Sequence, residues 1–152
     1  MRNPIPKSRP FDAEEPLACA SYRLRRAARK AAILYDRALK PVGLRNTQFS
    51  VLGALNFLGD ISIGDLAEEL ATDATTLNRT LGTLARDRLV TSVPGPDGRV
   101  RIVRLTDHGR TILETAMPLW RAAQEQVLKE TGPDRWAEAR LILQKIETAC
   151  DR

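Results

Sequence analysis

Apolar residues recur at alternating steps of three and four near the start of the chain. This spacing places them on one face of an α-helix, and Pro41 with Gly43 predicts where that helix ends. Residues 1–12 contain three prolines and few apolar side chains, so they are expected to form a mobile arm ahead of the helix. The apolar face consists of Leu17, Ala20, Leu24, Ala27, Ala31, Leu34 and Ala38.

A second helix is predicted from the apolar positions between residues 49 and 58. Asn46 or Thr47 is its expected N-cap, because a short polar side chain there can accept a hydrogen bond from a free N–H group of the first turn. The glycine that follows this segment should end the helix. Ser62 then caps a short third helix, with Asp65 three residues further on, close to a capping box.

A fourth helix is expected to open at Asp73 and to run to about residue 88. Its two sides differ in chemistry, because an apolar stripe lies opposite a polar face. The β-prone runs 90–93 and 100–105 follow, separated by a segment rich in proline and glycine, which predicts a β-hairpin. The apolar stripe consists of Leu77, Leu81 and Leu84.

Two long helices are predicted to complete the chain. Thr106 is the expected cap of the first, and Pro118 is expected to kink it. A break at residues 131–133 separates it from the last helix, where we expect Cys150 to be buried in the apolar seam. Because three such seams expose more apolar surface than one chain of this size covers, a homodimer is expected. The seams are Leu113, Ala116, Trp120, Ala123 and Val127 in the fifth helix and Trp136, Ala139, Leu143, Ile146 and Cys150 in the sixth.

The composition is typical of a single globular domain, with 152 residues of which 43% are hydrophobic and 28% charged. Two distant cysteines and one histidine argue against a disulfide framework and against a metal site, so no cofactor is expected. No catalytic triad or glycine-rich phosphate loop is visible, which argues against an enzyme. The apolar runs fall far short of the roughly 20 residues that span a bilayer, and no apolar signal core is visible, so a cytoplasmic location is expected.

The formal net charge of +5 favours an anionic partner, either nucleic acid or a membrane surface. Residues 1–40 carry ten basic and four acidic side chains, whereas residues 41–110 carry eight of each. All eight basic residues of this second segment are arginines, and three of them cluster in the predicted hairpin. This local cluster is more informative than the net charge. Its members are Arg99, Arg101 and Arg104.

Two short helices followed by a hairpin with an arginine-rich tip predict a winged helix-turn-helix, in a fold that is mainly α with a small β-hairpin. The fourth helix would enter the DNA major groove. Thr75, Thr76 and Asn78 would contact phosphates or base edges there, and Arg79 could form a bidentate contact with guanine.

The hairpin, or wing, would reach a neighbouring groove. An arginine of its tip, Arg99 or Arg101, could enter a narrow minor groove, where the negative potential is greatest. We expect Arg104 to be structural or exposed, and His108 to be a surface residue.

Over about residues 17–148 the sequence resembles the MarR family of winged helix-turn-helix transcriptional regulators. The resemblance implies a homodimer that binds pseudo-palindromic operators, usually as a repressor. It also implies that Arg79 is the arginine of the recognition helix, and that Asp97 steadies Arg99 for the minor groove. The residues that carry it are Gly43-Leu44, Gln48-Phe49-Ser50-Val51-Leu52, Ile63-Gly64-Asp65-Leu66-Ala67, Thr75-Thr76-Leu77-Asn78-Arg79, Leu89-Val90, Asp97-Gly98-Arg99 and Leu105-Thr106-Asp107-His108-Gly109.

The resemblance also divides the chain. Residues 13–40 and 107–152 would form a helical dimerisation region, and residues 41–106 the DNA-binding lobe. The sequence departs from the family pattern at Arg88, where a glycine often closes the recognition helix; a left-handed arginine would cost roughly 1 kcal/mol. Gly82 lies where longer polar side chains are usual.

The signal that controls such a regulator has two readings. The leading one is a small aromatic or anionic effector that releases the protein from its operator, and the arginines of the first helix could hold its carboxylate instead of only facing solvent. The alternative is redox sensing through Cys19, because Arg23 and Arg25 could lower the pKa of its thiol. Peroxide-sensing members of the family carry a cysteine displaced by one position. Without a redox role, Cys19 would be only a small residue beside the apolar seam of the helix. If the first and last helices of two subunits pack together, Cys19 could form a disulfide with Cys150 of the second subunit. A basic protein of the membrane surface is the remote alternative.

Overall fold

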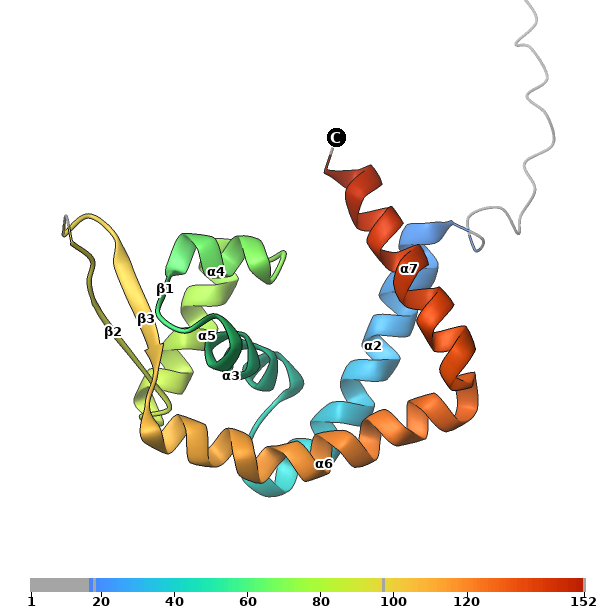
Figure 1. The fold of residues 1–152 in the computed structure, drawn as a ribbon, viewed down its shortest axis with the longest axis horizontal. Coiled ribbons are helices and arrows are strands. Elements are labelled where there is room, and N and C mark those ends of the chain that lie inside the picture. The colour runs from blue at the N-terminus through green and yellow to red at the C-terminus, as the bar shows by residue number, and fades with distance from the viewer. Residues whose placement is uncertain (1–16, 18, 97, 152) are drawn as a thin grey trace, which may run out of the picture. The chain divides into compact units, whose positions relative to one another are not determined.

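The protein is described from a computed structural model, which covers residues 17, 19–96 and 98–151. The chain divides into two compact units, residues 1–34 and 35–152, and helix α2 (Ala20–Leu39) begins in the first and ends in the second. The arm predicted for residues 1–12 lies outside the described residues. The other elements are η1 (Lys40–Val42), α3 (Asn46–Leu58), β1 (Ile61–Ser62), α4 (Ile63–Glu69), α5 (Ala74–Arg86), β2 (Val90–Pro94), β3 (Arg101–Leu105), α6 (Asp107–Thr131) and α7 (Pro133–Cys150) (Figure 1).

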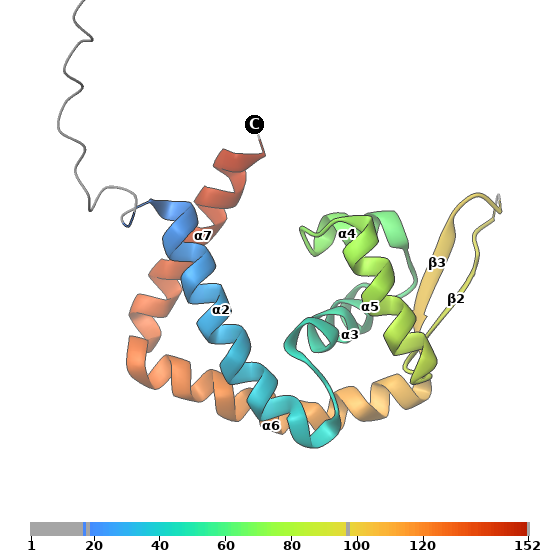
Figure 2. The same ribbon diagram turned by 180° about the vertical axis from the view of Figure 1, so that it is seen from behind.

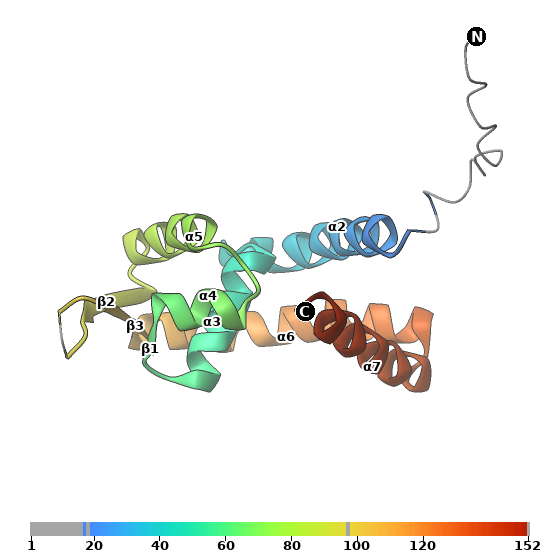
Figure 3. The ribbon, with the colours of Figure 1, turned by 90° about the horizontal axis from the view of Figure 1, so that it is seen from above.

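The second unit contains the predicted winged helix-turn-helix. Helices α3, α4 and α5 are followed by the β2–β3 hairpin, which projects beyond them (Figures 1 and 3). The two strands are antiparallel, with Val90 opposite Leu105 and Pro94 opposite Arg101. Strand β1 pairs with β3 and completes a sheet of order β1-β3-β2. This mainly helical fold with a small antiparallel sheet confirms the predicted fold class, although β1, two residues long, is too short to give an alternating pattern in the sequence.

Leucine side chains from α3, α4 and α5 form the core of the winged helix-turn-helix, which we call the winged unit. The predicted inward stripe of α5 is buried, and Val103 of the wing and Leu113 of α6 pack into the same cluster. Removing this much apolar surface from water is the main stabilising contribution to such a fold. The largest fully buried side chains are Leu39, Leu52, Leu55, Leu66, Leu77, Leu84 and Val103.

Aromatic rings join the end of α2 to α3 and α6. The ring of Trp120 stacks on Phe49 at a centroid distance of 5.8 Å and on Tyr35 at 6.5 Å. The Tyr35 hydroxyl donates a hydrogen bond to Oε1 of Gln124, and burial raises the pKa of Tyr35. Stacked aromatic pairs of this kind add to the energy of area burial alone.

Helix α3 begins differently from the prediction. Arg45, not Asn46 or Thr47, occupies the N-cap position. The Asn46 N–H donates to Oδ1 of Asp36, at 2.7 Å, and the Arg45 N–H donates to Oε1 of Gln48, at 2.8 Å. The expected N-cap is therefore wrong, because Asp36 from the last part of α2 binds one of the free N–H groups of the first turn.

The end of α5, the base of the wing and the start of α6 meet at one junction (Figure 2). The residues that form it are Arg88, Leu89, Thr106 and Gly109. The Thr106 hydroxyl donates to the carbonyl oxygens of Arg88 and Leu89, at 2.7 and 3.0 Å, and the Thr106 N–H also donates to Leu89, at 3.1 Å. The same hydroxyl accepts from the Gly109 N–H, which confirms Thr106 as the cap of α6. Arg88 is left-handed, with φ of 60°, so the chain tolerates the strain that its sequence implies.

Helices α6 and α7 are separated at Gly132, within the predicted break, and α6 continues through Pro118. The expectation that Cys150 is buried is wrong in the single chain. Cys150 is exposed because it is the last residue of α7, beyond the partly buried face of that helix. Leu141 and Ile142 on the same helix are 60% and 58% exposed. Across the described ranges, no helix has both the length and the apolar character needed to cross a membrane.

The junction predicts a strong effect for Gly109→Ala. A Cβ atom at this position would overlap the carbonyl oxygen of Leu89 and lie 2.8 Å from Cδ1 of Leu105. Overpacking against backbone should destabilise the fold by about 2 to 3 kcal/mol, measured by urea unfolding.

Gly64→Ala is the matched control, since its Cβ would have its nearest neighbour, the Ser62 hydroxyl oxygen, at 3.7 Å. We expect this variant to be as stable as wild type or slightly more so. Equal stability of the Gly109 and Gly64 variants would contradict the close contact at the junction.

Candidate nucleic-acid interface

The first turn of α5 is fixed by its own cap. The Thr76 N–H donates to Oδ1 of Asp73, at 2.8 Å, and the Thr76 hydroxyl donates to Oδ2 of the same carboxylate, at 2.6 Å. These hydrogen bonds, the hydroxyl first, lower the pKa of Asp73. Because the Thr76 hydroxyl already donates its proton within the cap, it is less available than neighbouring side chains to donate a hydrogen bond to a phosphate.

The outer face of α5 presents the remaining predicted side chains to solvent. Thr75, Asn78 and Arg79 are exposed, and so are Gly82 and Arg86. Helical spacing places them opposite the buried leucine stripe. Arg79 makes no ion pair with any residue that the structure describes. Its five N–H donors are therefore presented on the outer side of a well-anchored helix.

The wing arginines differ in their surroundings. The guanidinium of Arg101 is held by Ser92 on the neighbouring strand, from Nε to Oγ at 3.0 Å and from Nη2 to the carbonyl oxygen at 2.9 Å. Arg104 forms a salt bridge with Asp60, at 2.6 Å, and is half exposed, as predicted for a structural or surface residue. Arg99 is exposed in the segment before β3. Asp97, the predicted partner that steadies Arg99, lies outside the described residues.

A groove of about 230 Å³ separates α5 from the hairpin. We call it the helix–wing groove. Its lining consists of Asn78, Leu81, Gly82 and Ala85 on α5, Val90, Thr91, Ser92, Arg101 and Val103 on the wing, and Ile63 on α4. Ser92 is a residue of this site that the sequence alone did not indicate. Side chains alternate between the two faces of a strand, and this alternation places Ser92 and Arg101 on the same face of the hairpin once the pairing register is known.

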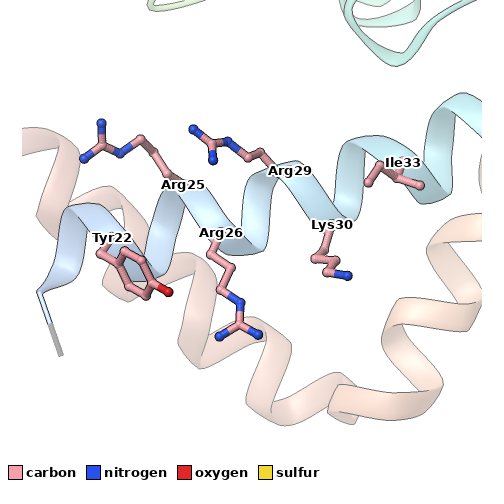
Figure 4. Close-up of a pocket in the computed structure, with 6 residues that line it drawn as sticks. All are labelled: Tyr22, Arg25, Arg26, Arg29, Lys30 and Ile33. Atoms are coloured by element: carbon pink, nitrogen blue, oxygen red, sulfur yellow. The ribbon is translucent and has the colours of Figure 1, made fainter. Parts of the chain in front are cut away.

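The first unit carries the basic face of α2. Arg25 and Arg29 extend from one side of the helix, and Arg26 and Lys30 extend from the opposite side (Figure 4). Together with Tyr22 and Ile33 they line a hollow of about 420 Å³. The basic side chains of this helix thus do not share one direction.

Cys19 lies just before α2 and is exposed. Hydrogen bonds from the backbone of Tyr22 and of Ser21, with a smaller contribution from the charge of Arg25, lower the pKa of its thiol below the ordinary value. A lowered pKa raises the fraction of reactive thiolate at neutral pH. The charge of an arginine contributes as predicted, although Arg23 does not.

Comparison with known proteins identifies this arrangement. The MarR family profile matches residues 42–99. One similar structure is the crystal structure of the Mycobacterium tuberculosis transcriptional regulator MosR in complex with DNA. The two sequences are 39% identical and the two folds superimpose with a TM-score of 0.80. The match covers 88% of this chain and 96% of the MosR chain.

Two curated relatives match a shorter part. The transcriptional activatory protein BadR of Rhodopseudomonas palustris is 38% identical over 97 residues, and the transcriptional repressor IacR of Pseudomonas putida is 30% identical over 95. These matches cover 60% and 62% of this chain, and they span only 55% and 57% of the two relatives. Since the match to MosR extends over nearly the whole of that regulator and the family profile covers helices α3 to α5 and strand β2, the chain belongs to the MarR family of transcriptional regulators.

Proposed function

We propose that this regulator is a homodimer that binds a pseudo-palindromic operator, with α5 in the major groove and the wing in the adjacent minor groove. In this proposal it acts as a repressor that a small-molecule effector releases. The observation that carries the DNA-binding proposal is the outer face of α5, where Thr75, Asn78 and Arg79 are all exposed beside an arginine-bearing wing. A helix of this kind, followed by a hairpin, is suited to reading one groove and reaching the next.

Each proposed contact follows from side-chain chemistry. Arg79 matches the two acceptors of guanine in the major groove, whereas Asn78 and Thr75 can bind base edges or phosphates. In the wing, Arg99 would enter the minor groove, with Asp97 orienting it, and Arg101 would add positive charge. Thr76 would contribute mainly by fixing the helix through Asp73.

Dimerisation is proposed through residues 13–40 and 107–152, leaving 41–106 as the DNA-binding lobe. Large apolar side chains in these two segments are exposed in the single chain, among them Ile33, Leu141 and Ile142. Large exposed apolar side chains of this kind are typical of surfaces that a partner covers. A second copy of the chain would also supply the two-fold symmetry that a palindromic operator requires.

The proposed effector is a small aromatic or anionic molecule. The hollow on α2 combines arginines, which bind carboxylates in bidentate fashion, with the ring of Tyr22. Binding could release the operator only if the effector favours a conformation with lower affinity for DNA. Of these two curated relatives, one is named an activator and the other a repressor.

A second candidate for the input is oxidation of Cys19, which is favoured by the exposure of the thiol and by its lowered pKa. The thiolate would attack one oxygen of a peroxide, the O–O bond would break, and a sulfenic acid and hydroxide would form. Condensation of this sulfenic acid with Cys150 of a second subunit would then release water and leave a disulfide between the subunits.

Arg79→Ala tests the recognition helix. Loss of a base or phosphate contact should weaken operator binding by about 1 to 3 kcal/mol, and it should relax sequence preference if the partner is a base. Competition titrations with operator and mutated duplexes measure both. Arg140→Ala, which removes an exposed cation from α7, should bind like wild type. If the two variants behave alike, the proposed placement of α5 is incorrect.

Arg99→Ala tests the wing. A minor-groove arginine responds to phosphate potential, so binding to specific and non-specific DNA should weaken together. In a dimer the slope of log affinity against log salt concentration should fall in magnitude by roughly 2. Asp97→Ala should act in the same direction but more mildly. An unchanged slope in a folded Arg99→Ala dimer would place the wing tip away from DNA.

Cys19→Ser separates the two inputs. If oxidation is the signal, peroxide should reduce operator affinity of the wild type while leaving Cys19→Ser bound to its operator. Because the thiol pKa is lowered, this response should extend to a lower pH than for an ordinary cysteine. Cys150→Ser should still be oxidised but should form no dimer on non-reducing gels. Equal responses of wild type and Cys19→Ser to peroxide would exclude the redox input.

A further inference from the structure

We propose that the helix–wing groove holds the sugar–phosphate strand that separates the major groove read by α5 from the minor groove reached by the wing. In this arrangement Arg101 binds a backbone phosphate, Ser92 positions the guanidinium of Arg101, and Gly82 leaves the space that the strand needs. This inference rests on the proposed function and adds a location and three residue roles to it.

The geometry of DNA makes such a crossing necessary. Adjacent major and minor grooves of B-DNA are separated by one sugar–phosphate strand. A protein that places a helix in one groove and a hairpin in the next must let this strand pass between the two elements. The helix–wing groove is the hollow that lies between α5 and the hairpin in the described part of the chain, with a volume of about 230 Å³.

Arg101 is held over this groove rather than at the tip of the wing. It lies opposite Pro94, and Ser92 lies opposite Val103, so Arg101, Ser92 and the buried Val103 share one face of the hairpin. All three of these residues line the helix–wing groove, together with Val90 at the base of the wing. Arg101 therefore faces the same space as Asn78 and Gly82 of α5.

Ser92 prepares the guanidinium to bind a phosphate. It accepts hydrogen bonds from Nε and Nη2 of Arg101 and so fixes one edge of the planar group. The Nη1 donors point away from this edge and remain for a ligand. A guanidinium that is already ordered loses less conformational freedom when it binds an anion, which favours affinity.

Gly82 lowers the stability of helix α5, although the fold leaves room for a side chain at this position. Glycine in the interior of a helix is less stable than alanine because its backbone loses more freedom on folding. In the free protein a Cβ at Gly82 would meet no neighbouring atom within 4 Å, so the fold itself does not require glycine there. The missing side chain leaves the outer face of α5 clear where the strand would cross, and close approach of a ligand backbone is a common reason for glycine.

Gly82→Ala gives the first test, because its effects on stability and on binding should have opposite signs. We expect the thermal midpoint to rise by about 3 °C. Affinity for an operator duplex, selected from a random library with wild-type protein, should fall about tenfold. Gly53→Ala is the matched control, since Gly53 also lies inside a helix and its Cβ would also meet no atom within 4 Å. That variant should gain similar stability without losing affinity.

Arg101→Ala gives the second test, in combination with operators that carry a neutral methylphosphonate at one position. For wild-type protein, one substitution between the major-groove and minor-groove contacts should lower affinity about tenfold. Arg101→Ala should bind the unmodified duplex more weakly than wild type does. The methylphosphonate at that position should not weaken the binding of this variant any further. Its salt slope should also fall by roughly 2 for a dimer. Ser92→Ala should keep the wild-type slope, because the charge remains, and should bind about threefold more weakly.

The outcomes separate this inference from the proposed function. If wild-type protein selects no sequence and binds no duplex, the proposed function fails and the groove assignment fails with it. If wild type binds and Arg79→Ala and Arg99→Ala weaken binding, but Gly82→Ala and Arg101→Ala keep wild-type affinity, only the groove assignment is overturned. Additive effects of Arg101→Ala and every methylphosphonate would also overturn it, because no phosphate would then be the partner of Arg101.

Discussion

The carbonyl oxygen of Leu89 accepts hydrogen bonds from both the backbone and the hydroxyl of Thr106, and Gly109 packs directly against it. This contact holds the end of α5, the base of the wing and the start of α6 together. A larger residue at position 109 would separate them, since a Cβ there would overlap the carbonyl group. The relative positions of the recognition helix and the wing therefore depend on the absence of one side chain and on the hydrogen bonds of one threonine.

Other parts of the winged unit depend on that arrangement. With α5 anchored at its start by Asp73 and at its end by the junction, its leucine stripe is buried and its polar face is turned outward. The same geometry sets the width of the helix–wing groove, because Ser92 and Arg101 belong to strands that begin and end at the junction. The same set of residues thus stabilises the fold and positions the proposed DNA contact. This set includes Arg88, whose backbone is in the strained left-handed conformation.

Local signals in the sequence predict much of this fold. Ser62, Asp73 and Thr106 were identified as helix caps because capping depends on residues three positions apart, and all three make the expected hydrogen bonds. The hairpin was predicted from its alternating pattern and its turn residues. The hydrogen bond from the start of α3 to Asp36 and the pairing of β1 with β3 both join residues that are distant in the sequence, so no local pattern predicts them. Burial of Cys150 was inferred from helical spacing alone, which does not show where a partly covered face ends. For the candidate site, the sequence predicted which cations lie on α5 and the wing, but the link between Ser92 and Arg101 required the register of the strands.

The most direct measurement for the central claim, that α5 and the wing read adjacent grooves of one operator in a two-fold dimer, is hydroxyl-radical footprinting combined with methylation interference at guanine N7. The account predicts two half-sites related by two-fold symmetry, one helical turn or a multiple of it apart. Each should show interference at a major-groove guanine and protection of the flanking minor groove and of the strand between them. Protection of a single continuous backbone segment without guanine interference, or of the minor groove alone, would contradict the account.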